Sequence, residues 1–339
     1  MKKIKVGMVG LVFGNVLINE LLSPANNQQY EITALCDLDR ERTDRFVERL
    51  GIKGYYDMDE MLAQSEMDAV VIITEPRGRA NLIRKAIRAG KHVMTTKPFE
   101  ACAEEAMSVL QEAKDLGKVI HINSPSPLYT QDLQIITDWQ KEYNLGRPIG
   151  CQCAVWVNYR ETPDGRWLDD PKRCPVAPVY RLGIYLINDL VRLLGEAEYV
   201  SVMQSWIFTQ RPTADNAQLG IAFKNGAMAQ VFASFCVNDT QTYNNSITLC
   251  YENGTVYRNV RRHTNACELT LIRPNGENQP ITEMRTAQTT SGMYQWDAFF
   301  RAVNGEKLDG EVAPGQVVEG VKIISAMARA QESGRVEMV

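Results

Sequence analysis

The sequence has few histidines and widely spaced cysteines, so a metal site has little support. Three histidines occur in 339 residues, and they lie far apart. Of the eight cysteines, only Cys151 and Cys153 lie close together, and two strand residues at this spacing do not form an ordinary disulfide. Protein zinc sites combine several such ligands at short, regular spacings. We therefore expect no metal, and reduced, buried thiols as in a cytoplasmic protein.

Long apolar runs and an excess of one charge are also missing. No apolar stretch reaches the roughly 18 residues that a membrane helix needs, so we expect no membrane partner. The 37 Lys and Arg residues against 41 Asp and Glu give a net charge of −4, which argues against a nucleic-acid partner. Hydrophobic residues make up 45% and charged residues 23%, as in a globular protein with material for two domains.

What is present begins at the first residues. An apolar run at Ile4–Val9 leads through Gly10 into a helical pattern, and the next apolar run ends at Asp37. This order is typical of a βαβ unit in which a glycine turn approaches a pyrophosphate and the acid binds ribose hydroxyls. The fingerprint G-x-G-x-x-G is incomplete, because Val12 replaces its second glycine and Gly14 comes one residue before the third. We expect Gly14 to supply the close packing of the helix.

A secretory signal is the alternative interpretation of this segment. Met1–Lys3 is basic, Val6–Ile18 is mostly apolar, and Ser23–Ala25 offers a cleavage site. Cleavage there would remove the strand on which the following repeats depend. We therefore favour a cytoplasmic protein.

The first third of the chain alternates short apolar runs with amphipathic helical patterns. Strict alternation is typical of a parallel, doubly wound sheet that binds its ligand at the carboxyl ends of the strands. The predicted strands are Ile4–Val9, Ile32–Leu35, Ala69–Thr74, His92–Thr95 and Val119–Asn123, and the predicted helices are Arg40–Leu50, Ala80–Ala89 and Ala103–Leu116.

The pattern changes after Asn123. Two prolines in Ser124–Pro127 indicate a junction between a domain of residues 1–123 and a domain of residues 124–339. The second domain is expected to be α+β, with a large, mostly antiparallel open sheet covered by helices or by another subunit. Its predicted strands are Ile149–Val157, Val200–Thr209, Ala217–Phe223, Ala227–Phe235, Thr242–Tyr251 and Thr255–Asn259, its helices are Tyr129–Tyr143, Leu182–Leu194, Tyr294–Val303 and Pro314–Ser333, and Asn158–Pro178 is a loop.

The run Ala89–Val93 followed by Thr96-Lys97-Pro98 resembles the glucose–fructose oxidoreductase, inositol dehydrogenase and rhizopine catabolism (Gfo/Idh/MocA) family. In that family the corresponding run ends in Glu-Lys-Pro at the end of a Rossmann strand. The resemblance extends over nearly the whole chain, through Cys36-Asp37, Asp68–Ile72, Gly183-Ile184-Tyr185, the Phe223–Phe235 hairpin and Phe299–Val303.

The resemblance implies a site around Lys97, which would reach between nicotinamide and substrate and stabilise charge on the reacting oxygen. A lone Lys-Pro pair would otherwise be a solvated loop. Asp37 opposes a 2′-phosphate by its charge and favours NAD over NADP. Arg79 stands where the family has histidine, and we expect it near the adenosine or pyrophosphate. The implied cofactor-binding set is Gly10, Val12, Phe13, Gly14, Asp37, Thr74, Arg79, Lys97 and Asn123.

In the second domain the family commonly has Asp-x-Gly-x-His, where this chain has Arg181 and Tyr185. The resemblance assigns Tyr185 as proton donor and acceptor, as in the glucose–fructose oxidoreductase branch; the alternative is a tyrosine packed at a domain interface. Arg181 would suit an anionic group on the substrate, or it is a surface arginine turned away from the cleft. Trp156 and Trp167 offer faces for a sugar ring, or they hold the loop to its domain.

Together these features predict an NAD-dependent oxidoreductase that acts on a sugar, polyol or sugar acid, with Lys97 and Tyr185 as catalytic residues. A homodimer or homotetramer through the second domain's sheet is implied by the resemblance. The alternative is a catalytically impaired family member that acts as a ligand-binding or regulatory protein, which Val12 and Arg181 favour.

Overall fold

The computed structural model describes residues 2–240, 243–261 and 266–339, which form two compact units. The first unit contains Met1–Leu128 and Tyr294–Pro314, and the second contains Tyr129–Met293 and Gly315–Val339. The division expected from the sequence, at residues 123 and 124, differs from these units in one main respect. It assigns 294–314 to the second domain, whereas this segment folds with the first unit.

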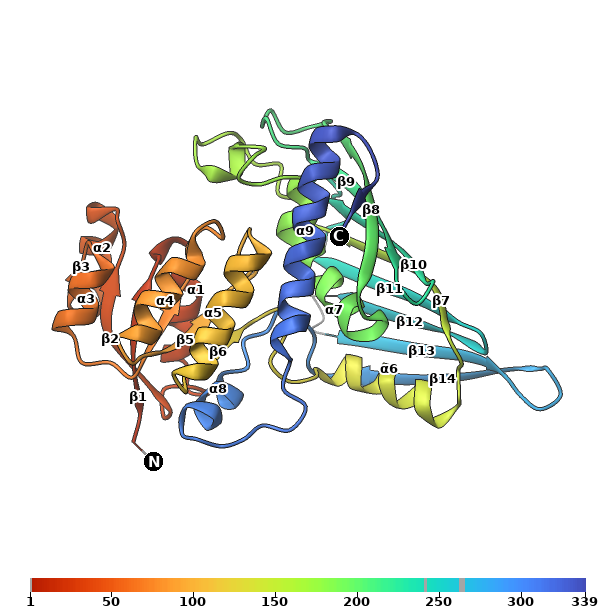
Figure 1. The fold of residues 1–339 in the computed structure, drawn as a ribbon, viewed down its shortest axis with the longest axis horizontal. Coiled ribbons are helices and arrows are strands. Elements are labelled where there is room, and N and C mark those ends of the chain that lie inside the picture. The colour runs from red at the N-terminus through yellow and green to blue at the C-terminus, as the bar shows by residue number, and fades with distance from the viewer. Residues whose placement is uncertain (1, 241–242, 262–265) are drawn as a thin grey trace. The chain divides into compact units, whose positions relative to one another are not determined.

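A six-stranded parallel sheet forms the centre of the first unit (Figure 1). The strand order β3-β2-β1-β4-β5-β6 places β1 in the interior of the sheet, as expected for a doubly wound fold. Buried apolar side chains fill both faces of the central strands. The strands are β1 (Ile4–Val9), β2 (Tyr30–Cys36), β3 (Gly54–Tyr55), β4 (Ala69–Ile72), β5 (His92–Thr95) and β6 (Ile120–Ile122).

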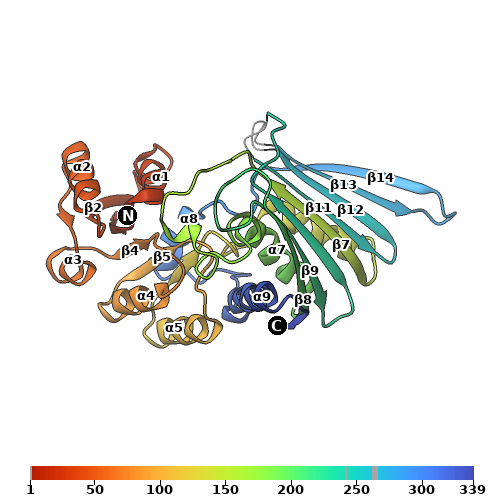
Figure 2. The same ribbon diagram turned by 90° about the horizontal axis from the view of Figure 1, so that it is seen from above.

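Helices cover both faces of this sheet, and Figure 2 shows α4 and α5 side by side on one of them. Local sequence sets their ends: Asp39 accepts a hydrogen bond from the Arg42 N–H at the start of α2, and Gly51 ends it in the left-handed conformation. The helices are α1 (Leu11–Leu22), α2 (Arg40–Leu50), α3 (Met58–Gln64), α4 (Arg79–Arg88), α5 (Ala103–Asp115) and α8 (Trp296–Val303), of which α3 was not predicted.

The helix α8 belongs to the core of the first unit although it comes late in the chain. Trp296, Phe299 and Phe300 are buried against side chains of α1, β1 and β2. The Tyr30 hydroxyl donates to the Trp296 carbonyl at 2.6 Å, and the Trp296 indole N–H donates to Glu20 at 2.9 Å. These contacts explain why 294–314 folds with the first unit.

The second unit contains a nine-stranded sheet of order β14-β13-β12-β11-β7-β10-β9-β8-β15. Only the β7 and β10 pair is parallel among the pairings described, so the sheet is mixed and mostly antiparallel. Three of its strands, β13, β14 and β15, were not predicted, and residue 242 of the predicted strand Thr242–Tyr251 lies outside the described residues. The strands are β7 (Pro148–Trp156), β8 (Ala197–Ser205), β9 (Asn216–Phe223), β10 (Met228–Ser234), β11 (Asn244–Tyr251), β12 (Gly254–Arg261), β13 (Ala266–Pro274), β14 (Pro280–Ala287) and β15 (Glu337–Met338).

Three helices of this unit, α6 (Gln131–Glu142), α7 (Ile184–Leu194) and α9 (Pro314–Ser333), lie on one side of the sheet (Figures 1 and 2). The helix α9 approaches α7 closely at Gly320, where a Cβ would stand 2.1 Å from Asn188 Oδ1. A π-helical turn at Val179–Gly183 precedes α7, so the expected helix is present but irregular at its start. Among the described residues, no helix combines the length and apolar character needed to cross a membrane.

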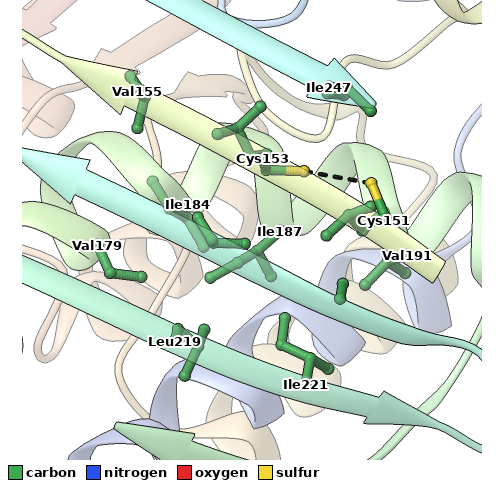
Figure 3. Close-up of a cluster of buried hydrophobic side chains, with 14 of the residues drawn as sticks. Cys151, Cys153, Val155, Val179, Ile184, Ile187, Val191, Leu219, Ile221 and Ile247 are labelled. Carbon is green, nitrogen blue, oxygen red and sulfur yellow. Dashed lines mark hydrogen bonds between the residues drawn. The ribbon is translucent and has the colours of Figure 1, made fainter. Parts of the chain in front are cut away.

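The core of the second unit lies between the sheet and α7 (Figure 3). Ile184 and Ile187 of α7 pack toward Cys151 and Cys153 of β7. The two sulfur atoms are 3.4 Å apart, and both thiols are free. The hydrogen bond with the Cys151 thiol and burial raise the pKa of Cys153 above its ordinary value. Both side chains are buried and help to fill this apolar core.

Candidate active site

The turn after β1 requires glycine. Gly10 has a φ of 87°, and a Cβ there would stand 2.3 Å from the carbonyl oxygen of Ile73. The Gly10 N–H donates to the Cys36 carbonyl at 2.9 Å, and α1 begins at the next residue. The helix start therefore lies directly at the carboxyl ends of β1, β2 and β4, where a Rossmann sheet binds its ligand.

Asp37 is held beside this turn. Its Oδ2 accepts the Leu11 N–H at 2.8 Å, and its Oδ1 accepts the Arg42 guanidinium and the Asp39 N–H, each at 3.0 Å. The side chain is 11% exposed, so the carboxylate is fixed but accessible at its edge. A carboxylate in this position can accept hydrogen bonds from vicinal ribose hydroxyls.

The first turns of α1 expose apolar side chains. Val12 and Phe13 are 53% and 50% exposed, and no acid lies in the first turn to offset the helix dipole. Because Val12 points away from the core, its side chain does not fill the turn itself. Gly14 does not supply the predicted close packing, since a Cβ there would meet only the Met8 Cε at 3.9 Å. Gly10, Asp37 and the start of α1 fit the pyrophosphate and ribose of a dinucleotide.

Lys97 follows β5 at the same edge of the sheet. It is the one partly exposed residue in the stretch 93–100, whose other members are buried. Its N–H donates to Oδ1 of Asn123 at 3.0 Å, and the Thr96 hydroxyl lies 3.4 Å from the same oxygen. Asn123, which is 2% exposed, therefore holds the backbone of Lys97. The structure brings these two predicted site residues together.

Arg79 is placed differently from the expectation. Its guanidinium is buried and donates to the backbone carbonyls of Thr96, Pro98, Phe99 and Thr74. The distances to Thr96 and Phe99 are 2.5 and 3.3 Å. Since these carbonyls surround the charged group, Arg79 is turned into the protein and not toward an adenosine or pyrophosphate. The Thr74 carbonyl is one of these acceptors, and a contact of Thr74 with the cofactor stays a prediction.

Tyr185 lies in the first turn of α7, half-buried. Gly292, with a φ of 97°, lies against its ring, and a Cβ at that position would stand 2.9 Å from the Tyr185 Cε1. The preceding residue, Ser291, donates its hydroxyl to Asp189, one turn further along α7. The segment before α8 therefore fixes one face of the Tyr185 ring.

Arg181 is paired inside the second unit. Its guanidinium donates to both carboxylate oxygens of Glu161, at 2.7 and 3.0 Å, and lies over the Tyr159 and Phe235 rings. Burial opposes ionisation of Glu161, but Arg181 and Arg211 together hold its pKa below the ordinary value. The Arg181 charge is thus neutralised by a neighbour that the sequence analysis did not identify.

The two tryptophans of the predicted substrate site lie apart in the fold. Trp156 ends β7, and its indole N–H donates to Asp239 at 3.0 Å. Trp167 lies in a short 3-10 helix and packs against the core of the unit.

A buried ionic cluster in the second unit was also missed by the sequence analysis. Arg258 Nη1 lies 2.8 Å from Asp132 and 3.5 Å from Asp189, and all three side chains are at most 3% exposed. Burial raises the pKa of Asp189 although Arg258 opposes the shift. These residues join β12, α6 and α7. No sequence spacing could have indicated the cluster, because its members are more than 50 residues apart. Among the described residues, no group of ligating side chains could hold a metal.

Two family models match the chain. One, described as the oxidoreductase family with an NAD-binding Rossmann fold, matches residues 4–124. The other, described as the GFO/IDH/MocA C-terminal domain, matches residues 134–257. The chain belongs to the GFO/IDH/MocA family of oxidoreductases. It is therefore an enzyme of the dehydrogenase and reductase class with an NAD-binding Rossmann domain, as the resemblance predicted.

Two relatives have the names of enzymes that act on sugars. The chain is 24% identical to 1,5-anhydro-D-fructose reductase of Ensifer adhaerens over 89% of its length and 90% of that protein. It is 25% identical to D-xylose 1-dehydrogenase (NADP(+)) 2 of Haloferax volcanii, over 67% and 68%. The WlbA dehydrogenase of Bordetella pertussis, solved with NADH and UDP-GlcNAcA, shares the fold with a TM-score of 0.74 at 17% identity, over 100% of this chain and 99% of that one.

Proposed function

We propose that this family member transfers hydride between NAD and a carbon-bound oxygen of a sugar or polyol. The observation that carries the proposal is the fixed Lys97 at the carboxyl end of β5, at the same edge of the sheet as the Gly10 turn and Asp37 of an NAD-binding domain. The named activities of the relatives, a sugar reductase and a sugar dehydrogenase, support the substrate class.

In this proposal Lys97 donates a hydrogen bond to the reacting oxygen and stabilises its developing charge. Tyr185 takes or gives the proton at that oxygen. Nicotinamide, when bound, supplies the hydride acceptor or donor. Lys97 belongs to the first unit and Tyr185 to the second, so their convergence on one substrate is part of the proposal.

We infer a preference for NAD over NADP. The ionised Asp37 repels a 2′-phosphate at the ribose, and Arg42 offsets only part of its charge because it is also paired with Asp39. Fluorescence titrations with NADH and NADPH test this inference. We expect NADH to bind at least about tenfold more tightly, the effect of one unscreened like-charge contact.

The pairing of Arg181 bears on the substrate. A guanidinium that already donates to both oxygens of Glu161 has less to offer a substrate carboxylate. We therefore favour a neutral sugar or polyol over a sugar acid. The roles first given to Arg181, Trp156 and Trp167 in substrate binding stay predictions.

We also propose that the protein forms a homodimer or homotetramer through the large sheet and works in the cytoplasm. Apolar side chains on five strands, 38% to 71% exposed, lie on the sheet face opposite α7: Met203, Met228, Tyr257, Ile272 and Met284. Exposed apolar residues on one face of a sheet are typical of a surface that another subunit covers. The eight free thiols fit a reducing compartment.

The function is tested with NAD and a panel of neutral sugars, polyols and sugar acids, followed by absorbance of NADH. We expect turnover with at least one neutral substrate. Lys97→Ala and Tyr185→Phe should each lower kcat by about 10²-fold or more while leaving NADH affinity nearly unchanged. A chain that binds no NADH at millimolar concentration, or variants that turn over like the wild type, would contradict the proposal.

A further inference from the structure

The guanidinium of Arg79 has an unusual environment. The residue is 1% exposed, and the acceptors described for it are backbone carbonyls of two neighbouring loops. Burying an ionised group costs several kcal/mol unless its donors are satisfied, so an arginine is seldom retained in such a place without a particular contact to make. Here the contacts are with the carbonyls that follow β4 and β5.

These carbonyls flank one residue. Arg79 donates to Thr96 O and Pro98 O, on the two sides of Lys97, and Asn123 accepts the Lys97 N–H. Hydrogen bonds therefore fix the backbone at residues 96, 97 and 98. Since the neighbours of Lys97 on both sides are buried, this backbone fixes the point from which its partly exposed side chain leaves the loop.

Glu100 binds the backbone of the two residues that flank Arg79. Its carboxylate accepts the Gly78 N–H at 3.1 Å and the Ala80 N–H at 2.8 Å, at the start of α4. The loop after β5 is thus joined to α4 by Glu100 and by Arg79. The start of α4 therefore fixes the position of the loop after β5.

We propose that Arg79 is the positioning residue of Lys97, acting through the Thr96 and Pro98 carbonyls and not by contact with cofactor or substrate. This inference rests on the proposed function of Lys97. It replaces the cofactor-binding role that the sequence suggested for Arg79. A misplacement of a catalytic group by about 1 Å can cost about 10²-fold in rate. Loss of the contacts of Arg79 with the Thr96 and Pro98 carbonyls is therefore expected to lower the rate measurably.

A double-mutant cycle tests the proposal. We expect Arg79→Gln to lower kcat at least tenfold and to leave the NADH Kd within threefold of the wild type. In a Lys97→Ala background the same substitution should cause no further loss, because Arg79 acts through Lys97. Arg88→Gln is the matched control, since Arg88 lies on the same helix, is 64% exposed and pairs with Glu112. It should change neither quantity.

A second measurement of the Lys97 environment does not depend on catalytic activity. The rate at which Lys97 is acetylated, measured by mass spectrometry relative to Lys91, should change at least threefold in Arg79→Gln, and the amides of 96–99 should exchange faster with solvent. Arg79→Lys, which keeps the charge and some donors, should give an intermediate effect and serves if the glutamine variant does not fold.

The outcomes separate the two proposals. Equal losses from Arg79→Gln in both backgrounds, or an unchanged Lys97 acetylation ratio with unchanged amide exchange, would overturn the positioning role. If Lys97→Ala turns over like the wild type, the proposed mechanism fails, and the acetylation ratio still decides whether Arg79 directs the lysine.

Discussion

At the residue scale, the sequence pattern predicted residues whose positions are set by the local backbone. Gly10 and Asp37 were found from their place after apolar runs, because turn geometry and strand ends are local properties. The partners of Arg79 and Arg181 were not found. Three of the carbonyls around Arg79 lie 17 to 20 residues onward, and Glu161 lies 20 residues before Arg181, at positions that only the folded chain brings together.

The contact of Gly292 with the Tyr185 ring gives a prediction at this scale. Gly292→Ala should destabilise the protein by about 1–2 kcal/mol through its positive φ and by about 1–3 kcal/mol more through the clash with the ring. It should also lower turnover, because the ring must move. Gly226→Ala is the control, with a φ of 90° and no atom within 4 Å of its Cβ. Urea unfolding and kcat measure both variants, and equal effects would contradict the assigned contact.

At the element scale, the sequence analysis predicted β7 to β12 of the large sheet and missed β13, β14 and β15, although Cys267, Leu269 and Leu271 are buried alternately along β13. The strand β14 has a single buried residue, Ala287, and therefore lacks the alternation that identifies a strand. The π-helical turn before α7 was missed because its residues are as apolar as those of the helix that follows. The loop Asn158–Pro178 showed no periodicity, so the ionic contact of its Glu161 with Arg181, in the π-helical turn before α7, could not be anticipated.

That contact predicts how pH acts on the loop. Glu161→Gln should destabilise the protein by about 1–2 kcal/mol at neutral pH, allowing for the part of Glu161 that faces water. Because the folded-state pKa of Glu161 is lowered, its contribution is present above the ordinary value of 4.5 and is lost as the pH falls through the lower folded value. The difference in the free energy of unfolding between the variant and the wild type should therefore become smaller at acid pH. Glu48→Gln, on an exposed position of α2, should show no such pH dependence.

At the scale of the whole molecule, composition and alternation indicated a Rossmann domain followed by an α+β domain, and the family match confirms both classes. The return of 294–314 to the first unit was not predictable. The apolar stripe of α8 shows that the helix is buried, but it does not show which core receives it. The pairing of Trp296 with Tyr30 and Glu20 decides the matter, and those partners are about 270 residues away.

This arrangement predicts that the first unit folds by itself only with its late segment. The Gln295 side chain accepts the Leu128 N–H at 2.8 Å and donates to the Leu128 carbonyl at 3.1 Å, so residues 128 and 294 lie close enough to be joined by a short glycine–serine linker. The linked protein of residues 1–128 and 294–314 should unfold cooperatively and bind NADH.

Residues 1–123 alone are the comparison for this linked protein. They lack Trp296, Phe299 and Phe300, and the loss of each buried aromatic costs about 3–5 kcal/mol. The sum, about 9–15 kcal/mol, is comparable to the usual stability of a domain, about 5–15 kcal/mol, so this fragment should show no cooperative transition. Circular dichroism during urea unfolding and NADH fluorescence measure both proteins. If residues 1–123 unfold cooperatively and bind NADH as tightly as the linked protein, the domain boundary expected from the sequence is the correct one, and α8 is dispensable for the nucleotide site.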